Sequence, residues 1–263
     1  MIKNIFLSII CIAVFGNAKD ITIKVGATPV PAAEILEFAK PILKKQGIDL
    51  VVQSFTDYIT PDIALNDGSS DANMYQHKPF LEQINKDRGF DLVALEPIYI
   101  VPLGFYSKKY KSVDSIKNGA TIALPNDPTN YSRALILLHD NGVIKLKDSS
   151  NLASSEFDII ENKKNLKFKQ VEAAMLPKVL DGIDAAVINA NYALQANMSL
   201  KEAFFYESDK SAYVNVFATK KGNENNPNIL KVQEVLLSKE VKDFILKKYK
   251  GESQIAFIPF VWF

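Results

Sequence analysis

The sequence predicts an α/β fold built from two groups of elements. In both groups, short stretches that alternate apolar and polar residues are followed by apolar stripes at helical spacing, and turn residues separate them. The chain has 263 residues, of which 48% are hydrophobic and 23% charged, which is typical of a globular protein with one large or two modest domains. Strands that alternate with short helices favour a mainly parallel sheet.

The first group of elements starts after a leader and repeats a strand-to-helix cycle. Its first loop contains Pro29 and Pro31, and its first helix is closed by Gly47. Strands are predicted over residues 21–26, 49–55 and 71–74, and helices over 32–46, 61–67 and 79–88.

Residues 92–106 form a long apolar run that contains Pro97 and Pro102, so it is too interrupted for one buried strand. The second group follows it, and a third segment ends the chain. We expect strands over 120–124, 158–160, 166–171, 185–188 and 213–219, and helices over 133–141, 176–180, 227–237 and 241–248.

The absence of a long linker predicts two lobes that share crossover strands, with a small-molecule site in the cleft between them. Residues 99–107 and 213–219 are the expected crossovers. The predicted division is a signal peptide at 1–18, lobe 1 at 19–104 and 214–263, and lobe 2 at 105–213.

Residues 1–18 have the anatomy of a secretory signal peptide: Lys3, an apolar run over 5–15, and small residues at the end. The run is shorter than the ~20 residues of a membrane-spanning helix. The sequence therefore predicts export to the periplasm. Cys11, the single cysteine, is an alternative lipid-attachment site, which the bulky Ile10 before it disfavours.

Composition and motifs exclude several function classes. The 31 basic and 30 acidic side chains nearly cancel, so no global field attracts nucleic acid, and no nucleic-acid partner is expected. Nucleotide-binding glycine loops, serine-hydrolase elbows and zinc-protease histidine pairs are missing from the sequence. We therefore expect neither a metal nor another cofactor.

Arg133 is the first candidate binding residue. The chain has two arginines, Arg88 and Arg133, among many lysines, so an arginine here suggests a requirement for its geometry. Arg133 follows a strand end and a polar turn, and its planar fork suits a carboxylate. The alternative is an ordinary salt bridge on the first turn of a helix.

Three asparagines complete a set suited to a zwitterion, because an amide accepts from an ammonium group and donates to a carboxylate. Asn189 and Asn191 follow a predicted strand, and Asn215 interrupts another. Turn chemistry and an edge-strand position are the alternatives. His77 lies where a strand runs into a helix, at the edge that faces ligands in α/β sheets, whereas His139 is expected to be structural.

These stretches together resemble the methionine-binding lipoprotein family, the substrate-binding proteins of methionine ABC importers. The similarity covers nearly the whole mature chain. The matching segments are residues 23–29, 33–38, 71–77, 106–109, 120–133, 165–168 and 184–194.

The resemblance implies a type II periplasmic-binding-protein fold with the ligand held between two α/β lobes. It implies that Arg133 takes the ligand carboxylate, that Asn189 or Asn191 together with Asn215 holds the charged backbone groups, and that aromatic residues surround the side chain. The implied ligand-binding set is Tyr58, Asn73, Tyr75, His77, Phe80, Asn130, Arg133, Asn189, Asn191 and Asn215.

Departures from the family pattern leave the exact ligand open. Tyr75 and Phe80 stand where the family more often has phenylalanine and tyrosine, and Tyr131-Ser132 replaces a usual Gly-Gly. The expected function is a monomeric periplasmic receptor, not an enzyme, that delivers L-methionine or a related amino acid to an inner-membrane permease.

Alternatives are a receptor for a methionyl dipeptide or another amino acid, and a ligand-free adhesin or signalling ectodomain. An exported hydrolase using His77, Ser69 or Ser70, and Asp71 is the rival from the enzyme class.

Overall fold

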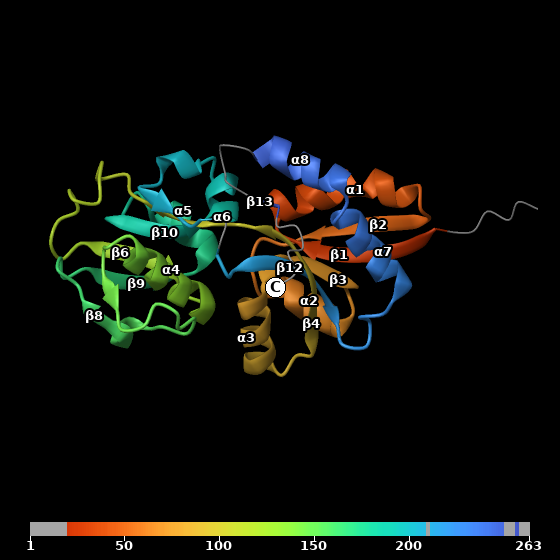
Figure 1. Ribbon diagram of the computed structural model, residues 1–263, viewed down its shortest axis with the longest axis horizontal. Helices are drawn as coiled ribbons and strands as arrows, with labels where there is room; N and C mark the ends of the chain where they lie inside the picture. Colours follow the sequence, from red (N-terminus) through yellow and green to blue (C-terminus); the bar gives the residue numbers. More distant parts are fainter. Residues whose placement is uncertain (1–19, 209–210, 250–255, 258–263) are drawn as a thin grey trace, which may run out of the picture.

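The computed structural model describes residues 20–208 and 211–249, together with the backbone of residues 256 and 257. The predicted signal peptide and Cys11 lie outside the described residues. The chain forms two lobes that lie side by side, each built around its own sheet (Figure 1). Between residues 20 and 249, the described helices include none that is long and apolar enough to cross a membrane.

The first lobe contains a six-stranded sheet in the order β13-β4-β12-β3-β1-β2. Strand β1 pairs in parallel with β2 and β3, whereas β12 pairs antiparallel with both β3 and β4. The strands are β1 (Ile21–Ala27), β2 (Ile48–Ser54), β3 (Ala72–His77), β4 (Leu92–Ile100), β12 (Val214–Lys220) and β13 (Ala256–Phe257).

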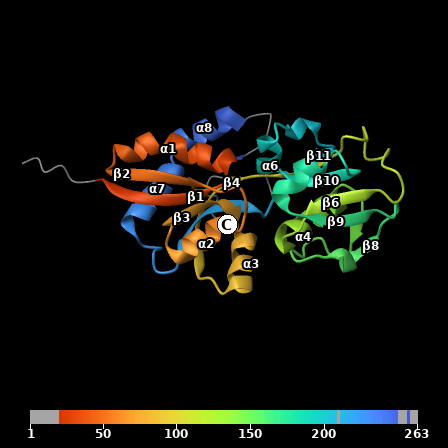
Figure 2. The same ribbon diagram turned by 180° about the vertical axis from the view of Figure 1, so that it is seen from behind.

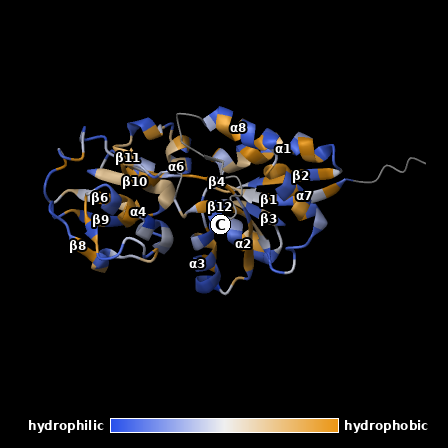
Figure 3. Cartoon of the chain, viewed as in Figure 1, coloured by the Kyte–Doolittle hydropathy of each residue, from blue (hydrophilic) through white to orange (hydrophobic). Residues whose placement is uncertain are grey.

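Helices cover both faces of this sheet (Figures 1 and 2). Ile35, Leu36, Ala39 and Leu43 bury one side of α1 in the core, and the helices show mixed hydropathy in Figure 3. The helices are α1 (Glu34–Lys44), α2 (Thr60–Asp67), α3 (Lys78–Arg88), α7 (Pro227–Leu236) and α8 (Lys239–Tyr249), with a short helical turn at Pro29–Ala33. α1 and α8 lie on one side, and α2 and α3 on the other.

The second lobe contains a five-stranded sheet in the order β11-β5-β10-β6-β9 and a small β7-β8 pair. Its strands are β5 (Leu103–Tyr106), β6 (Thr121–Pro125), β7 (Lys145–Leu146), β8 (Ile159–Glu161), β9 (Lys167–Val171), β10 (Ala185–Asn189) and β11 (Phe205–Tyr206). Its helices are α4 (Pro128–Asp140), α5 (Leu176–Val179) and α6 (Ala190–Gln195), with short turns at Glu156–Asp158, Ala173–Met175 and Leu200–Glu202.

The α/β prediction is confirmed, but the mainly parallel sheet is wrong. Both sheets are mixed, because the strands next to the lobe crossings, β4, β5 and β12, pair antiparallel with their neighbours. The chain leaves the first sheet after residue 100 and enters the second at residue 103. It returns between residues 206 and 214, just before β12 rather than within it.

The helix predicted over residues 133–141 begins earlier, at Pro128. The Asp127 side chain accepts a hydrogen bond from the Asn130 backbone N–H, and Pro128 occupies the first turn, where its missing N–H costs nothing. Arg133 therefore lies on the second turn of α4 rather than at its start. β7 and β11 were not expected, because two residues cannot carry a periodic pattern, and the six-residue α6 was not expected either.

Candidate functional site

A narrow cavity lies between the two lobes. Its walls come from both lobes. The lining residues are Thr28, Pro31, Tyr58, Tyr75, Gln76, His77, Phe80, Tyr99, Val101, Asn130, Arg133, Asn189, Asn191 and Asn215.

All the binding residues expected from the sequence line this cavity except Asn73. The Asn73 side chain is buried, and its Nδ2 donates to the Pro61 carbonyl (3.0 Å) and to Asp62 Oδ1 (2.9 Å) in α2. Asn73 also lies against Gly26 of β1. A Cβ added to Gly26 would stand only 2.3 Å from Asn73 Oδ1, so no larger residue fits there. Asn73 thus ties β3 to α2 and β1, and we leave it out of the proposed ligand contacts.

His77 caps the N-terminus of α3 and faces the other lobe. Its Nδ1 accepts from the Phe80 backbone N–H (3.1 Å), so the ring hydrogen is on Nε2, which donates to Asn130 Oδ1 (3.3 Å). Burial, together with the nearby Arg133 charge, lowers the pKa of His77 to about 3. His77 is therefore a neutral hydrogen-bond donor at physiological pH.

The hydrolase alternative finds no support in these contacts. Ser70 Oγ donates to Gln53 Oε1 (2.7 Å), and Asp71 Oδ2 accepts from the Lys24 backbone N–H (2.7 Å). The hydrogen-bond partners of His77 are Asn130 and the Phe80 backbone, so Ser70, Asp71 and His77 do not form the chain of nucleophile, base and carboxylate that acyl transfer requires.

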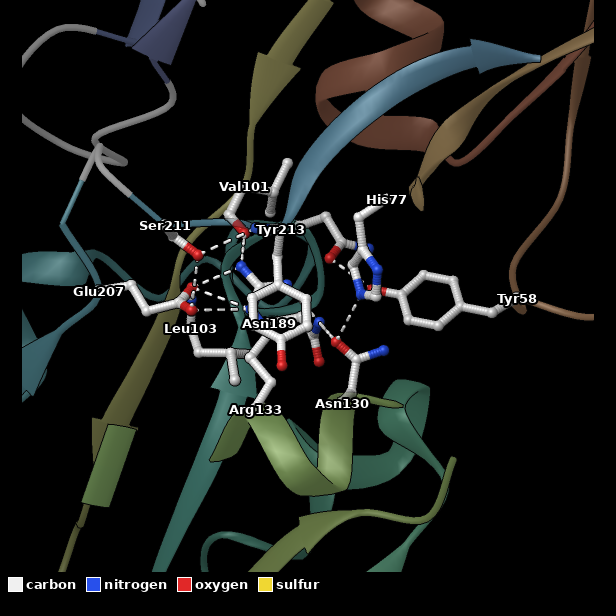
Figure 4. Close-up of polar contacts among 11 residues, drawn as sticks. Tyr58, His77, Val101, Leu103, Asn130, Arg133, Asn189, Glu207, Ser211 and Tyr213 are labelled. Atoms are coloured by element: carbon white, nitrogen blue, oxygen red, sulfur yellow. Dashed lines mark hydrogen bonds and ion pairs between the residues drawn. The ribbon is translucent and has the colours of Figure 1, made fainter. Parts of the chain in front are cut away.

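Arg133 is almost fully buried, with 2% of its side chain exposed. Its Nε donates to both carboxylate oxygens of Glu207 (2.9 and 3.0 Å), and its Nη2 donates to Glu207 Oε2 and to the Val101 carbonyl (Figure 4). The Tyr213 ring stacks against the guanidinium, 4.7 Å from its Cζ. Arg133 thus makes a salt bridge, which was the alternative expected from the sequence, and it also lines the cavity.

Several polar atoms in the cavity wall lack a partner. Among the described residues, the buried Gln76 Oε1, Asn189 Oδ1 and Asn191 Nδ2 have no hydrogen-bond partner. The opposite end of each amide is held: by Asp62 for Gln76, by Asn130 for Asn189, and by the Tyr58 hydroxyl for Asn191. Buried polar groups are rarely left unpaired, so two acceptors and one donor in one cavity indicate a polar ligand with both kinds of group.

Aromatic rings form the rest of the wall. Tyr58 lies at the centre, with ring centroids 6.0 Å from Tyr75, 5.9 Å from Phe80 and 4.9 Å from Tyr192. The Tyr75 hydroxyl donates to the Tyr58 carbonyl (2.7 Å) and so is not free for a ligand. The wall is therefore suited to an apolar side chain.

Gln76 and Glu207 were missed in the sequence. Gln76 stands between Tyr75 and His77 in the matching segment 71–77, so its place in that segment was an available signal. Glu207 precedes the return crossing, and no local pattern connects it with Arg133.

Comparison with known proteins shows the family of this chain. The family model described as NlpA lipoprotein matches residues 23–257. The chain belongs to the NlpA lipoprotein family.

Relatives within and around this family are named for binding and transport. The D-methionine-binding lipoprotein MetQ of Escherichia coli (strain K12) is 42% identical over 233 residues, which cover 87% of this chain and 86% of MetQ. A nutrient binding protein from Burkholderia cenocepacia, solved bound to methionine, has a TM-score of 0.85 and 42% identity, covering 89% of this chain and 99% of that chain.

A further solved structure, an ABC transporter periplasmic substrate-binding protein from Coxiella burnetii, has a TM-score of 0.81 and 37% identity, with 86% of this chain and 96% of that one covered. The predicted periplasmic-binding-protein fold is therefore confirmed. The family and its relative MetQ are both named as lipoproteins. This points to lipid anchoring, whereas the bulky Ile10 before Cys11 led us to expect none.

Proposed function

We propose that the protein is an extracytoplasmic receptor that binds L-methionine, or a closely related amino acid, in the cavity between its lobes and presents it to the permease of an ABC importer. The observation that carries the proposal is the set of unpaired polar atoms beside an aromatic wall. A family that includes methionine-binding relatives supports it.

The polar atoms divide into the two halves of a zwitterion. Arg133 Nη1 and Asn191 Nδ2 are the proposed donors to the ligand carboxylate, and Gln76 Oε1 and Asn189 Oδ1 the proposed acceptors for its ammonium group. Asn130 and Asn215 complete the polar wall.

The side chain of the ligand would lie against Tyr58, Tyr75, His77 and Phe80. A thioether gains about 0.3 to 1.5 kcal/mol for each favourable contact with an aromatic ring, which suits methionine to this wall. The small cavity favours one amino acid over a dipeptide.

Calorimetry with L-methionine tests the proposal directly. Micromolar or tighter binding, about −8 kcal/mol or better, is expected. Absence of heat and of a thermal shift with L-methionine, D-methionine and methionyl dipeptides would favour the ligand-free alternative instead. Elution as a single subunit in sizing chromatography is expected for the proposed monomer.

Arg133→Ala should weaken methionine binding by roughly 2 to 5 kcal/mol, because the ligand carboxylate loses its charged partner in a buried site. Arg88→Ala is the matched control, since Arg88 lies exposed at the end of α3. Equal affinities for the two variants, measured by calorimetry on folded protein, would contradict the assigned role.

We also propose that Cys11 carries a lipid anchor, as the lipoprotein relatives suggest. The Cys11→Ser variant should then move from the membrane fraction to the soluble periplasmic fraction. If wild type is already soluble and its mature N-terminus lies near Lys19, the protein is exported without an anchor.

A further inference from the structure

The guanidinium of Arg133 presents different edges to different surroundings. Its Nε and Nη2 edge is fully used by Glu207 and the Val101 carbonyl. Its Nη1 makes one long contact, 3.5 Å to Asn130 Oδ1, on the side where Asn189 also lies (Figure 4). Only Nη1 is therefore left for a ligand.

Glu207 lies behind the arginine, outside the cavity. It is absent from the cavity lining, although Arg133 and Val101 belong to it. Its carboxylate also accepts from the Leu103 backbone N–H (2.9 Å) and from Ser211 Oγ (3.1 Å), which lie beside the two chain crossings. With partners on three segments, the carboxylate is a fixed support behind the wall rather than a substitute for a ligand carboxylate.

Glu207 also sets the charge of the site. A guanidinium with 2% exposure is poorly solvated, and the adjacent carboxylate with 11% exposure cancels its charge. The other titratable groups that line the cavity are uncharged: His77 is neutral, and burial raises the pKa of the Tyr58, Tyr75 and Tyr99 hydroxyls, so they keep their protons. Because the charges of Arg133 and Glu207 already cancel, a bound ligand leaves the buried site with no net charge only when the ligand itself has none.

We propose that Glu207 is a positioning and selectivity residue: it turns the Nη1 edge of Arg133 toward the cavity and cancels the arginine charge, so that the site selects zwitterions over monoanions of the same shape. This inference rests on the proposed amino-acid-binding function.

The test compares two ligands in wild type and Glu207→Gln. L-methionine is the zwitterion, and desaminomethionine, which has hydrogen in place of the ammonium group, is the monoanion. The glutamine keeps an oxygen for the Leu103 N–H but removes the negative charge. The preference for methionine over desaminomethionine should fall at least tenfold in Glu207→Gln.

Glu161→Gln is the matched control, because it makes the same charge change at an exposed strand of the second lobe, where Glu161 pairs with Lys163. Its ligand preference should equal that of wild type. If Glu207→Gln weakens both ligands by one common factor, Glu207 is only structural and the proposal is wrong. If wild type binds neither ligand, the proposed function itself fails.

A measurement on wild type covers the case in which Glu207→Gln does not fold. The sequence has two arginines, so isotope-labelled arginine gives two assignable Nε–H signals by nuclear magnetic resonance. The Arg133 Nε–H should be protected from solvent exchange both without and with methionine. Loss of protection when methionine binds would mean that the ligand displaces Glu207, and would overturn the proposal.

Discussion

Gln76 reaches the cavity because Asp62 holds its amide nitrogen from behind, at 2.6 Å. The same Asp62 Oδ1 accepts from Asn73 Nδ2, so a single buried carboxylate fixes two side chains of β3. Asp62 has no exposed surface, and its Oδ2 has no hydrogen-bond partner assigned among the described residues. The orientation of one cavity residue therefore depends on a group that never touches the cavity.

Asp62→Asn should raise the stability of the protein at neutral pH. Burial raises the pKa of Asp62 from its ordinary 3.8 to about 6, so between these values the folded protein binds the proton that the unfolded chain has released. Stability therefore falls as pH rises through this window, by up to about 3 kcal/mol at roughly 1.4 kcal/mol per pKa unit.

Denaturant unfolding of wild type and Asp62→Asn across pH 4 to 8 measures this effect. The variant should gain about 1 to 3 kcal/mol above pH 6 and less near pH 4. Asp87→Asn, a change at an exposed carboxylate of α3, is the control. If the difference in unfolding free energy between wild type and Asp62→Asn does not change with pH, the burial argument is contradicted.

Single residues differ in how far the sequence predicts them. The scarcity of arginine identified Arg133, and the polar breaks after strands identified Asn189 and Asn191, since all three are local signals. Glu207 lies 74 residues from Arg133, and its pairing depends on where the chain returns to the first lobe. A pair of this kind leaves no mark in periodicity or spacing.

At the scale of elements, the N-terminal cap of α4 both stabilises this helix and orients a residue of the cavity. Asp127 accepts from the backbone N–H of Asn130, and also from its side-chain Nδ2 (3.0 Å). This turns Asn130 Oδ1 toward His77 and Asn189. The helix cap thus orients a cavity residue.

Asp127→Ala should lower stability by about 0.5 to 2 kcal/mol and also weaken methionine binding, because Asn130 loses its support. Asn226→Ala removes the equivalent cap from α7, where Asn226 accepts from the Asn228 N–H (3.0 Å) away from the cavity. Thermal unfolding should show losses in both variants, whereas calorimetry should show weaker binding only in Asp127→Ala. If Asp127→Ala and Asn226→Ala bind methionine equally well, the α4 cap does not orient the binding site.

Element types were more predictable than element ends. The stripe of α1 fixed that helix, since its apolar spacing matches one buried face. The sequence places the start of α4 too late, because the apolar pattern begins after the polar residues Thr129 and Asn130, of which Asn130 lines the cavity. Strand direction in the mixed sheets could not be predicted, because it depends on the path between lobes.

At the scale of the whole molecule, hydrogen bonds join the lobes around the cavity. Tyr58 Oη donates to Asn191 Oδ1 (2.7 Å), and Tyr192 Oη donates to the Thr56 carbonyl (3.3 Å). The His77–Asn130 contact is a third connection. These bonds exist only when the lobes are close together, so they stabilise the closed arrangement.

Tyr58→Phe should speed ligand release about 2- to 13-fold, which corresponds to the loss of one hydrogen bond worth roughly 0.5 to 1.5 kcal/mol. Stopped-flow fluorescence with methionine measures the dissociation rate. The control is Tyr131→Phe, which removes a hydroxyl bonded to Glu156 within the second lobe. If both variants release ligand at the wild-type rate, the Tyr58 bond does not hold the lobes together.

The position of β12 between β3 and β4 bears on how the newly made chain folds. The five strands of the second sheet are contiguous, from residue 103 to residue 206, so they can pair as soon as that stretch is available. The first sheet must wait, with β3 and β4 unjoined, until residues 214–220 fill the gap. The half of the protein that is synthesised first is therefore the half that is completed last.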